Sequence, residues 1–232
     1  MPIKLMINPD QSRRLFLLGS AVLLGGCATS GPSDSRLLPG LVWGPDSGED
    51  EVQDTAAAKL AVPSGVIARS RWAKGSPIPS RMNRMRPVKR ITVHHDGMSI
   101  YTATAWNDTA SRLETIRSSH LRRTPEKFGD IGYHFAIDPS GRVWQCRPLS
   151  WQGAHVARQN QGNLGIVVLG NYDKQTVNAK QQAALVRFMR VCMKQYKVPV
   201  SKVATHQEMD ATACPGRSLQ AFMVRARRST LA

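Results

Sequence analysis

A histidine and a cysteine lie eight positions apart (214 − 206) in the segment HQEMDATACPG, residues 206–216. His206 and Cys214 are residue types that bind zinc, but two ligands do not make a site. A second candidate source is the pair His94 and His95, which ends the β-branched segment RITVHH, and loops that follow strands commonly carry functional groups. The sequence therefore suggests a metal centre whose third ligand comes from a distant segment.

The chemistry of such a centre requires the cysteine to be a thiolate, the form that binds a metal. Cys214 precedes Pro215 at the expected start of a helix, and the positive end of a helix dipole lowers the pKa of a thiol. Two histidines and one thiolate would leave the fourth tetrahedral position of zinc open for water, as in catalytic sites. The simpler alternative is that each histidine is an ordinary buried strand residue.

The elements that would position these residues alternate between strands and helices. Apolar and β-branched patterns predict strands over 90–95, 131–137, 142–146, 164–170 and 202–206. Helical periodicity predicts helices over 108–121, 178–196 and 217–226, the first two capped by Asp108 and Asn178. The sequence thus predicts a single α/β domain with a mixed central β-sheet and helices packed on its faces.

The first 26 residues have the features of an export signal. Arg13 and Arg14 form a twin-arginine pair, and the apolar run 15–26 is well short of the ~20 residues that a membrane-spanning helix needs. The segment LGGC, which ends at Cys27, resembles a lipobox; the alternative is a plain signal peptide with an incidental cysteine. We expect lipidation of Cys27 to anchor the protein to a bacterial membrane, facing the periplasm.

The composition changes after Cys27 in a way that predicts a tether followed by one domain. Residues 27–65 are rich in glycine, proline, serine and acidic residues, which is typical of a disordered segment. Residues 66–232 are numerous enough to bury one hydrophobic core. We therefore expect three regions: the signal 1–26, the tether 27–65 and a domain over 66–232.

The strongly basic composition bears on the partners of the protein. The formal net charge is +16, and acidic residues are concentrated in the expected tether, so the domain is more basic still. A basic surface attracts polyanions. Nucleic acid is not an expected partner, because the sequence carries neither a recognition motif nor an aromatic and basic face, and export separates the chain from it. The charge suits an anionic cell envelope.

Several stretches of the sequence together resemble a known family. They are ITVHHDG, GDIGYHFAIDPSGRVWQCRP, WQGAHV, NLGIVVLGNY and HQEMDATACPG, which occur in this order over roughly 68–220. In this combination the chain resembles the zinc-dependent N-acetylmuramoyl-L-alanine amidases, which include phage amidase-type lysozymes and animal peptidoglycan recognition proteins. The resemblance implies a zinc cofactor and hydrolysis of the amide between N-acetylmuramic acid and L-alanine in peptidoglycan or its muropeptide fragments.

The resemblance also implies roles for individual residues. It marks His94, His206 and Cys214 as zinc ligands, and Tyr133 and Thr212 as catalytic groups that act on the substrate. The Tyr133 hydroxyl could donate a hydrogen bond to the oxyanion of the tetrahedral intermediate. Phage members carry lysine where this chain has Thr212, whereas active animal members have threonine, so the proton donor to the leaving amine stays open.

Further residues near these motifs are candidates for substrate binding. By the resemblance, His155 lines the substrate groove, while Trp151 and Arg147 could stack on a sugar or meet a peptide carboxylate, with core packing as the alternative. His95 and His134 are expected in the core or behind the ligands. Two other groups of interest are alternative bases, Glu208 and Asp210, and two cysteines that could pair in an oxidising compartment, Cys146 and Cys192.

Two functional hypotheses stay open at this point. The first is a lipid-anchored zinc amidase, expected to be a monomer, that acts on peptidoglycan or muropeptides. The second is a binding module of the same fold that recognises muropeptides without cutting them. Non-cutting relatives commonly have serine at the position of Cys214 and lose the metal, so Cys214 favours the enzyme.

Overall fold

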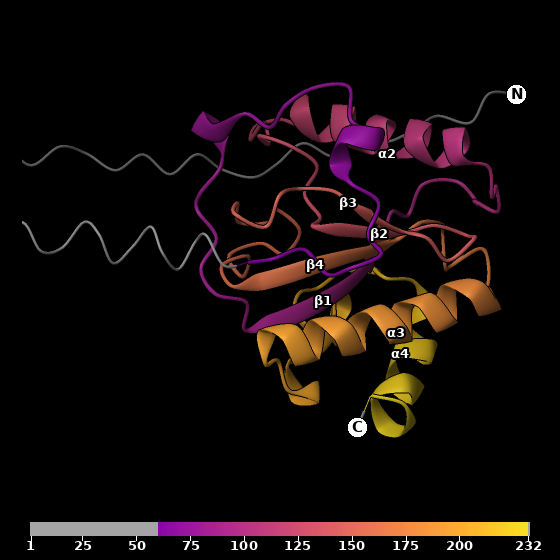
Figure 1. Ribbon diagram of the computed structural model, residues 1–232. Helices are drawn as coiled ribbons and strands as arrows, with labels where there is room; N and C mark the ends of the chain where they lie inside the picture. Colours follow the sequence, from indigo (N-terminus) through magenta and orange to yellow (C-terminus); the bar gives the residue numbers. More distant parts are fainter. Residues whose placement is uncertain (1–59, 232) are drawn as a thin grey trace, which may run out of the picture. The chain divides into compact units, whose positions relative to one another are not determined.

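The computed structural model describes residues 60–231, and their centre is a five-stranded sheet in the order β3-β2-β4-β1-β5 (Figure 1). Strands β2 and β3 pair antiparallel, while β2–β4, β4–β1 and β1–β5 are parallel. The mixed α/β sheet expected from the sequence is therefore confirmed. The strands are β1 (Arg90–His95), β2 (Phe135–Ile137), β3 (Val143–Gln145), β4 (Asn163–Val168) and β5 (Val203–Thr205).

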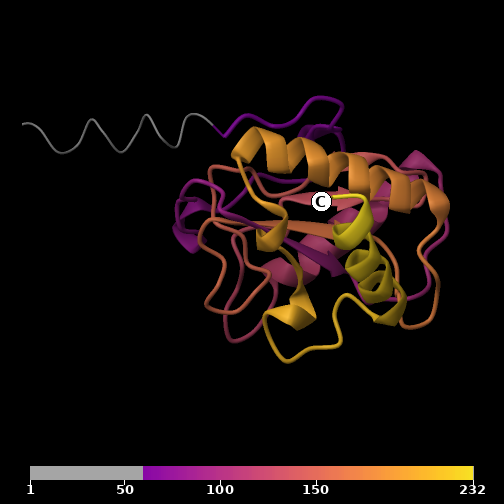
Figure 2. The ribbon, with the colours of Figure 1, turned by 90° about the horizontal axis from the view of Figure 1, so that it is seen from below.

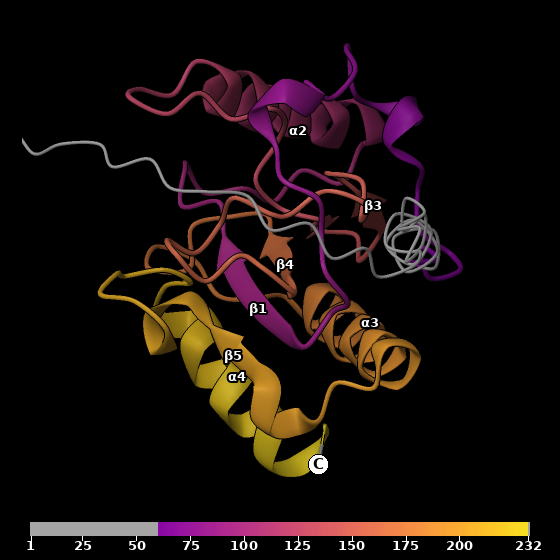
Figure 3. The same ribbon diagram turned by 90° about the vertical axis from the view of Figure 1, so that its left-hand side faces the viewer.

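Helices cover both faces of this sheet. Helix α2 (Trp106–Leu121) lies on one face, and α3 (Ala179–Tyr196) and α4 (Arg217–Ser229) lie on the other (Figure 3). Figure 2 shows α3 and α4 from their own side, in front of the strands. Four short 3-10 helices complete the elements: η1 (Arg69–Arg71), η2 (Pro79–Arg81), η3 (Val200–Lys202) and η4 (His206–Glu208).

The alternation of side chains along the strands divides the core into two clusters. In β2, Phe135 and Ile137 pack with α3 and α4, whereas Ala136 packs with α2. Every residue of β4 is buried, as expected for a strand covered on both faces. The apolar surface removed from water on both sides of the sheet is the main stabilising contribution, at about 25 cal/mol per Å².

The two predicted N-caps, Asn178 of α3 and Asp108 of α2, have different outcomes in the structure. Asn178 is the N-cap of α3, and its side chain accepts a hydrogen bond from the Gln181 N–H at 2.9 Å, as predicted. The predicted cap Asp108 is wrong, because α2 already begins at Trp106 and Asp108 lies in its first turn. The Trp106 ring packs against the Trp144 ring with centroids 4.4 Å apart. This contact favours the longer helix over the local cap.

The strand predicted over 131–137 is shorter than expected and begins at Phe135. Before that point, the Gly132 carbonyl accepts a hydrogen bond from Ala154 N–H at 2.9 Å, and Gly132 N–H donates to His120 Nδ1 at 3.0 Å. A Cβ atom at Gly132 would lie 2.4 Å from the Ala154 carbonyl oxygen, so this close approach needs a glycine. The segment therefore bonds to a loop and a helix instead of extending the strand.

The two other cysteines in the described part of the chain do not form a disulfide. Cys146 and Cys192 are both free and buried, and they belong to different core clusters on opposite faces of the sheet. The Cys146–Cys192 pair that the sequence left open is therefore not formed, and Cys192 is a buried thiol on the apolar side of α3. Burial raises the pKa of the Cys192 thiol to about 12, so it remains a small apolar core residue.

The described chain makes contact with the domain from its first residues. Leu60 packs against the core, and the Ala61 carbonyl accepts a hydrogen bond from the Tyr196 hydroxyl at 2.8 Å. The last residues of the expected tether 27–65 thus touch α3. The export signal, Cys27 and the tether up to residue 59 lie outside the described residues. Among residues 60–231, no helix is both long and apolar enough to cross a membrane.

Candidate metal centre and active site

Parallel pairing of β1 with β5 brings the two histidine-bearing strand ends together. Val93 pairs with Thr205, and the next residues along the two strands are His94 and His206. Their imidazole rings have centroids 4.7 Å apart. Because the carboxyl ends of parallel strands lie at the same edge of a sheet, residues far apart in sequence meet at one site.

The loop 206–216 returns Cys214 to the same edge. Gln207 N–H donates to the Cys214 carbonyl at 2.8 Å, which closes the loop, and Cys214 N–H donates to Thr212 Oγ1 at 3.2 Å. One ligand atom from each of His94, His206 and Cys214 lies within 4.8 Å of the others. The three predicted metal ligands are therefore brought together.

The spacing of these donor atoms suits zinc. Cys214 Sγ lies 3.6 Å from His94 Nδ1. In a tetrahedral zinc site, a nitrogen at ~2.0–2.1 Å and a sulfur at ~2.3 Å from the metal lie about 3.6 Å apart. Two imidazoles and a thiol also favour zinc, because calcium and magnesium bind mainly through oxygen ligands. The residues present thus fit the implied metal.

Glu208 fastens the ligand loop to α4. Its carboxylate accepts hydrogen bonds from Thr205 N–H at 2.9 Å, from Gln220 Nε2 at 2.8 Å and from the guanidinium of Arg227. Partial burial acts to raise the pKa of Glu208, but the hydrogen bonds from Arg227, Thr205 and Gln220 outweigh it and lower the pKa to about 2. Glu208 is thus a loop anchor, whereas the other suggested base, Asp210, lines the cavity described below.

The surroundings of Cys214 do not support the expected lowering of its thiol pKa. Helix α4 begins at Arg217 with Gly216 as its N-cap, so Cys214 lies before its first turn. Burial raises the pKa of Cys214 to about 12 and outweighs a hydrogen bond to the His95 carbonyl. The helix-dipole argument is therefore wrong here, and a metal ion would have to displace the thiol proton on binding.

A cavity of about 620 Å³ opens beside the three ligands. Four of the predicted site residues line it together with Cys214: Tyr133, His155, His206 and Thr212. His94 is only 1% exposed and lies behind them. Residues that the sequence did not single out as site residues also line the cavity, and their polar, charged or aromatic members are Asp96, His120, Arg123, Glu126, Phe128, Arg158 and Asn160.

Tyr133 is held next to the metal ligands with its hydroxyl available. Its ring centroid lies 5.2 Å from that of His94. Burial, and then the nearby Cys214, raise the pKa of Tyr133, so it stays protonated at neutral pH and can donate. Within residues 60–231 the Tyr133 hydroxyl has no hydrogen-bond partner. This side chain can therefore serve a bound ligand.

His155 lies between the cavity and the strands. It is 8% exposed, its Nδ1 lies 3.0 Å from His94 Nε2, and its Nε2 lies 3.1 Å from the Asn163 carbonyl oxygen. Burial, and next the neighbouring His134, lower the pKa of His155 well below its ordinary value, so the ring is neutral. The predicted groove residue is thus also in direct contact with a predicted metal ligand.

The other two predicted substrate-binding residues lie away from this cavity. The guanidinium of the buried Arg147 donates to the main-chain carbonyls of Asp130, Ile131 and Gln152. Trp151 packs its ring under the guanidinium of Arg84, 4.4 Å from the ring centroid. Arg147 borders a neighbouring hollow of about 360 Å³. The structure therefore does not bring Arg147 and Trp151 to the metal ligands.

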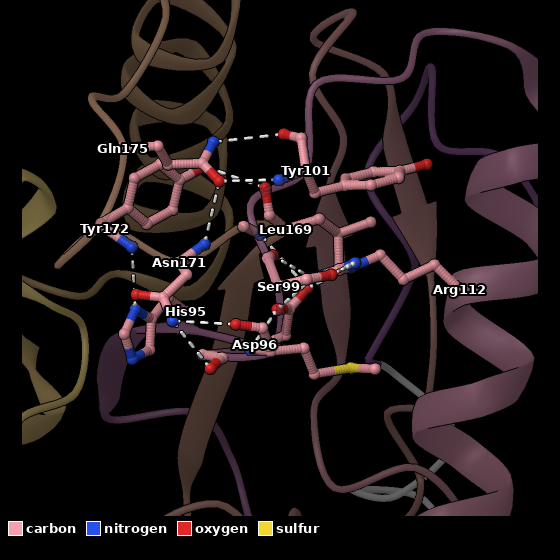
Figure 4. A network of polar contacts seen from close by, with 12 residues as sticks. His95, Asp96, Ser99, Tyr101, Arg112, Leu169, Asn171, Tyr172 and Gln175 are labelled. Atoms are coloured by element: carbon pink, nitrogen blue, oxygen red, sulfur yellow. Dashed lines mark hydrogen bonds and ion pairs between the residues drawn. The ribbon is translucent and has the colours of Figure 1, made fainter.

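The two other histidines near the ligands take structural positions. His134 is buried, accepts from Gly165 N–H at 3.0 Å and donates from Nε2 to the Trp151 carbonyl at 3.1 Å. His95 lines the cavity, and its Nδ1 accepts from Tyr172 N–H at 3.3 Å (Figure 4). His134 fits the expectation of a core residue, whereas His95 is half-buried and lies on the cavity wall.

Asp96 connects the cavity to α2 through a buried ion pair. Its carboxylate accepts two hydrogen bonds from Arg112, each 2.7 Å long, and one from Gly170 N–H at 3.2 Å (Figure 4). The side chains of Asp96 and Arg112 are 1% and 9% exposed. The loop that follows His95 is thereby held against both α2 and the loop that follows β4.

His120 shows how a functional position can be missed. The sequence pattern places it only in the helical periodicity of α2, but its Nδ1 accepts from Gly132 N–H, so Nε2 carries the hydrogen. Burial is the largest of the effects that lower the pKa of His120 to about 4, so it is a neutral donor lining the cavity. Only the packing of α2 beside Gly132 reveals this, because its helical spacing is that of a core residue.

The chain matches a known family and known sequences. The family described as N-acetylmuramoyl-L-alanine amidase matches residues 84–217. A peptidoglycan-recognition protein of Drosophila melanogaster is 34% identical over 155 residues, covering 65% of this chain and 81% of that protein. The N-acetylmuramoyl-L-alanine amidase of Mus musculus is 27% identical over 157 residues, covering 65% of this chain and 28% of that protein.

Solved structures share the fold. The crystal structure of Drosophila peptidoglycan recognition protein SD has a TM-score of 0.61 at 25% identity, covering 70% of this chain and 94% of that one. Peptidoglycan recognition protein-LE in complex with tracheal cytotoxin, a monomeric diaminopimelic acid-type peptidoglycan, has a TM-score of 0.61 at 21% identity. That match covers 68% of this chain and 92% of the other.

Proposed function

Because the chain belongs to the N-acetylmuramoyl-L-alanine amidase family, we propose that it is a zinc-dependent hydrolase of the bond between N-acetylmuramic acid and L-alanine. The observation that carries this proposal is the convergence of His94, His206 and Cys214 within 4.8 Å beside the cavity. A protein that only bound its ligand would have no need of a third ligand with the chemistry of a thiol. The substrate is peptidoglycan or a muropeptide.

Each ligand residue would hold the metal through a defined atom or side chain. His94 would use Nδ1, the nitrogen that faces Cys214 Sγ, and His206 would complete the set from the end of β5. Zinc bound there supplies Lewis acidity, which polarises an amide carbonyl and acidifies a water molecule. The loop anchor Glu208 fastens the start of the loop that carries His206 and Cys214 to α4 through its bonds to Thr205 and Gln220.

Tyr133 and Thr212 supply hydrogen bonds to the reacting amide. The Tyr133 hydroxyl is protonated and uncommitted to any described partner, so it can donate to the oxyanion that develops on the carbonyl. Thr212 Oγ1 already accepts from Cys214 N–H, which leaves its own hydrogen free to donate toward the cavity it lines. Neither hydroxyl carries charge, so both suit orientation and charge stabilisation.

The cavity suits a polar, charged substrate. Arg123 and Arg158 line it together with the acidic Glu126 and Asp210, and His120 offers an Nε2–H donor. Asn160 holds the wall by accepting from the N–H groups of His155 and Val156, each at 2.9 Å. A muropeptide, with amide groups, hydroxyls and carboxylates, has the matching chemistry. The related recognition protein-LE, which was solved with tracheal cytotoxin, supports this class of ligand.

The proposed localisation rests on the N-terminal sequence. We propose that the mature protein is anchored to a bacterial membrane, facing the periplasm, through a lipidated Cys27. The support for this is the twin-arginine pair and the LGGC segment at the end of a short apolar run. An enzyme tethered in this way could reach peptidoglycan beside the membrane.

One experiment separates the enzyme from the non-catalytic binding module. Purified full-length protein would be incubated with peptidoglycan and with a purified muropeptide, with and without a chelator, and the products identified by mass spectrometry. We expect release of the stem peptide from the sugar, lost with the chelator and restored by zinc. Binding of the muropeptide without any cleavage, in protein that contains zinc, would establish the binding module instead.

A further inference from the structure

A line of polar groups runs inward from the half-buried thiol of Cys214 to the backbone of β4. Cys214 Sγ lies 3.6 Å from His94 Nδ1, and His94 Nε2 lies 3.0 Å from His155 Nδ1. On its far side, His155 Nε2 lies 3.1 Å from the main-chain carbonyl oxygen of Asn163. His94 and His155 are both buried, so the contacts of the His155 ring with His94 and Asn163 are made away from solvent.

The carbonyl at the end of this line determines where the hydrogens lie. A carbonyl oxygen only accepts hydrogen bonds, so His155 Nε2 must carry a hydrogen and donate it to Asn163. The Nδ1 of a neutral His155 then has a lone pair and accepts from His94 Nε2–H. The remaining nitrogen of His94, Nδ1, is left without a hydrogen and faces Cys214. That is the atom a metal ion needs.

The opposite arrangement would require a charged ring. If His155 Nδ1 donated to His94, both nitrogens of His155 would carry hydrogens and the ring would be a cation. Within residues 60–231 no carboxylate contacts the His155 ring, which is buried among other imidazoles. A buried cation without a counter-ion is strongly disfavoured, so the neutral arrangement prevails.

The position of the His155 ring is set by two glycines. A Cβ atom at Gly153 would lie 2.5 Å from His155 Cδ2, and one at Gly165 would lie 2.6 Å from the same atom. A side chain at either position would clash with the ring and displace it from its present position. The backbone around Gly153 and Gly165 thus forms a slot that fits an imidazole and fixes its orientation.

We propose that His155 is a positioning residue that holds His94 in the tautomer and orientation with a bare Nδ1 directed at the zinc site. This role is additional to any contact that His155 makes with substrate, and it rests on the proposed zinc function. The acceptor for His155 Nε2 is the main-chain carbonyl of Asn163, so a change of the Asn163 side chain would leave this acceptor in place. Partners behind a metal-binding histidine typically change metal affinity about 10–100-fold when removed.

The first test reads the tautomers directly in the metal-free full-length protein. Heteronuclear NMR of the histidine ring nitrogens distinguishes a nitrogen that bears hydrogen from one with a lone pair. We expect hydrogen on Nε2 of both His94 and His155 and lone pairs on both Nδ1 atoms. Hydrogen on His94 Nδ1 or on His155 Nδ1 would overturn the proposal, whether or not the protein binds zinc.

The second test measures zinc affinity by competition with a chelator. His155→Leu removes the acceptor, and we expect zinc to bind about 10–100-fold more weakly. His155→Asn places an amide oxygen near the former Nδ1 and should recover part of the loss. His134→Leu is the matched control, because it removes a neighbouring buried imidazole that does not bond to His94, and it should keep the wild-type zinc affinity.

The outcomes separate this proposal from the proposed function. If the wild-type protein failed to bind zinc, the proposed zinc hydrolase would be contradicted. The NMR measurement of the ring tautomers would still test the hydrogen bond between His94 and His155. Zinc affinity of His155→Leu equal to that of the wild type would overturn the positioning role and leave the enzyme intact. Equal losses in His155→Leu and His134→Leu would assign the effect to loosened packing and also overturn it.

Discussion

The sulfur of Cys214 lies 3.6 Å from Nδ1 of His94, although 120 positions separate the two residues in the chain. Parallel pairing of β1 with β5 and the closed loop 206–216 create this proximity. The distance matches two ligands of one tetrahedral zinc ion. Removing either donor should therefore abolish the metal centre without removing the cavity, since the cavity is also built by other elements.

Cys214→Ser should abolish zinc binding and amidase activity while muropeptide binding survives. A hydroxyl is far less acidic than a thiol and is a poor third ligand at neutral pH. Metal content by elemental analysis, cleavage by mass spectrometry and binding by calorimetry check the three parts. Thr212→Ala is the matched control in the same loop and should keep zinc. A serine variant with full zinc and full cleavage would remove Cys214 from the site.

Tyr133→Phe should keep zinc and the fold but slow turnover by about 10²–10³, the usual loss when one oxyanion donor is removed. The control is Tyr101→Phe, which removes a hydroxyl that contacts Thr109 Oγ1 at 3.1 Å outside the cavity. That variant should lose about 0.5–1.5 kcal/mol of stability and retain turnover. Steady-state kinetics measures the turnover of both variants, and urea unfolding measures their stability. Unchanged turnover in Tyr133→Phe would make its hydroxyl merely structural.

Arg112→Gln should destabilise the protein by about 3–5 kcal/mol, because it leaves the buried Asp96 carboxylate without its charged partner. Urea unfolding of the metal-free protein measures this loss. Arg217→Gln is the comparison, since the Arg217 side chain is 88% exposed and its Nε lies 3.9 Å from the Asp173 carboxylate. An exposed pair of this kind contributes at most about 1 kcal/mol. Similar effects of the two changes would contradict the importance assigned to the Asp96–Arg112 pair.

Glu208 should make stability depend on pH in the acidic range. Its folded pKa, about 2, is below the ordinary value of 4.5, so its contribution is present above about pH 4.5 and is lost as the pH falls through about 2. Glu208→Gln should therefore be less stable than the wild type at neutral pH, and the difference should shrink on acidification. The carboxylate is partly exposed, so solvent screening keeps this difference to at most about 1 kcal/mol.

The measurement for Glu208 is thermal unfolding of metal-free protein across this pH range. Metal-free protein is needed because acid also removes metal ions from histidine and cysteine ligands. Arg227→Gln should lose most of the stability that Glu208→Gln loses at neutral pH, because Arg227 donates to both carboxylate oxygens of Glu208. A gap between wild type and Glu208→Gln that stayed constant down to about pH 2 would contradict the lowered pKa.

Cys27→Ala should release the protein from membranes without changing cleavage of a soluble muropeptide. The motivation is the LGGC segment at the end of the apolar run 15–26. Membrane fractionation followed by immunoblotting measures the distribution. A variant that still sedimented with lipid after a high-salt wash would contradict anchoring through Cys27.

The sequence by itself determined the features that depend on neighbouring residues. The apolar run 164–170 predicted a strand buried on both faces, and Asn178 predicted the start of α3. Such signals are local, because a cap or a strand face involves residues within a few positions of one another. The resemblance to the amidases implied that His94, His206 and Cys214 are metal ligands, and the structure brings these three residues together.

The tertiary structure alone decided what depends on burial and on contacts across the sheet. Trp106 starts α2 by packing on Trp144, and burial raises the Cys214 pKa where the local helix argument lowers it. His155 meets His94 across 61 positions, and a backbone carbonyl at Asn163 orders their hydrogens. These effects come from groups that are distant in the chain and adjacent only when the strands pair, so no local pattern encodes them.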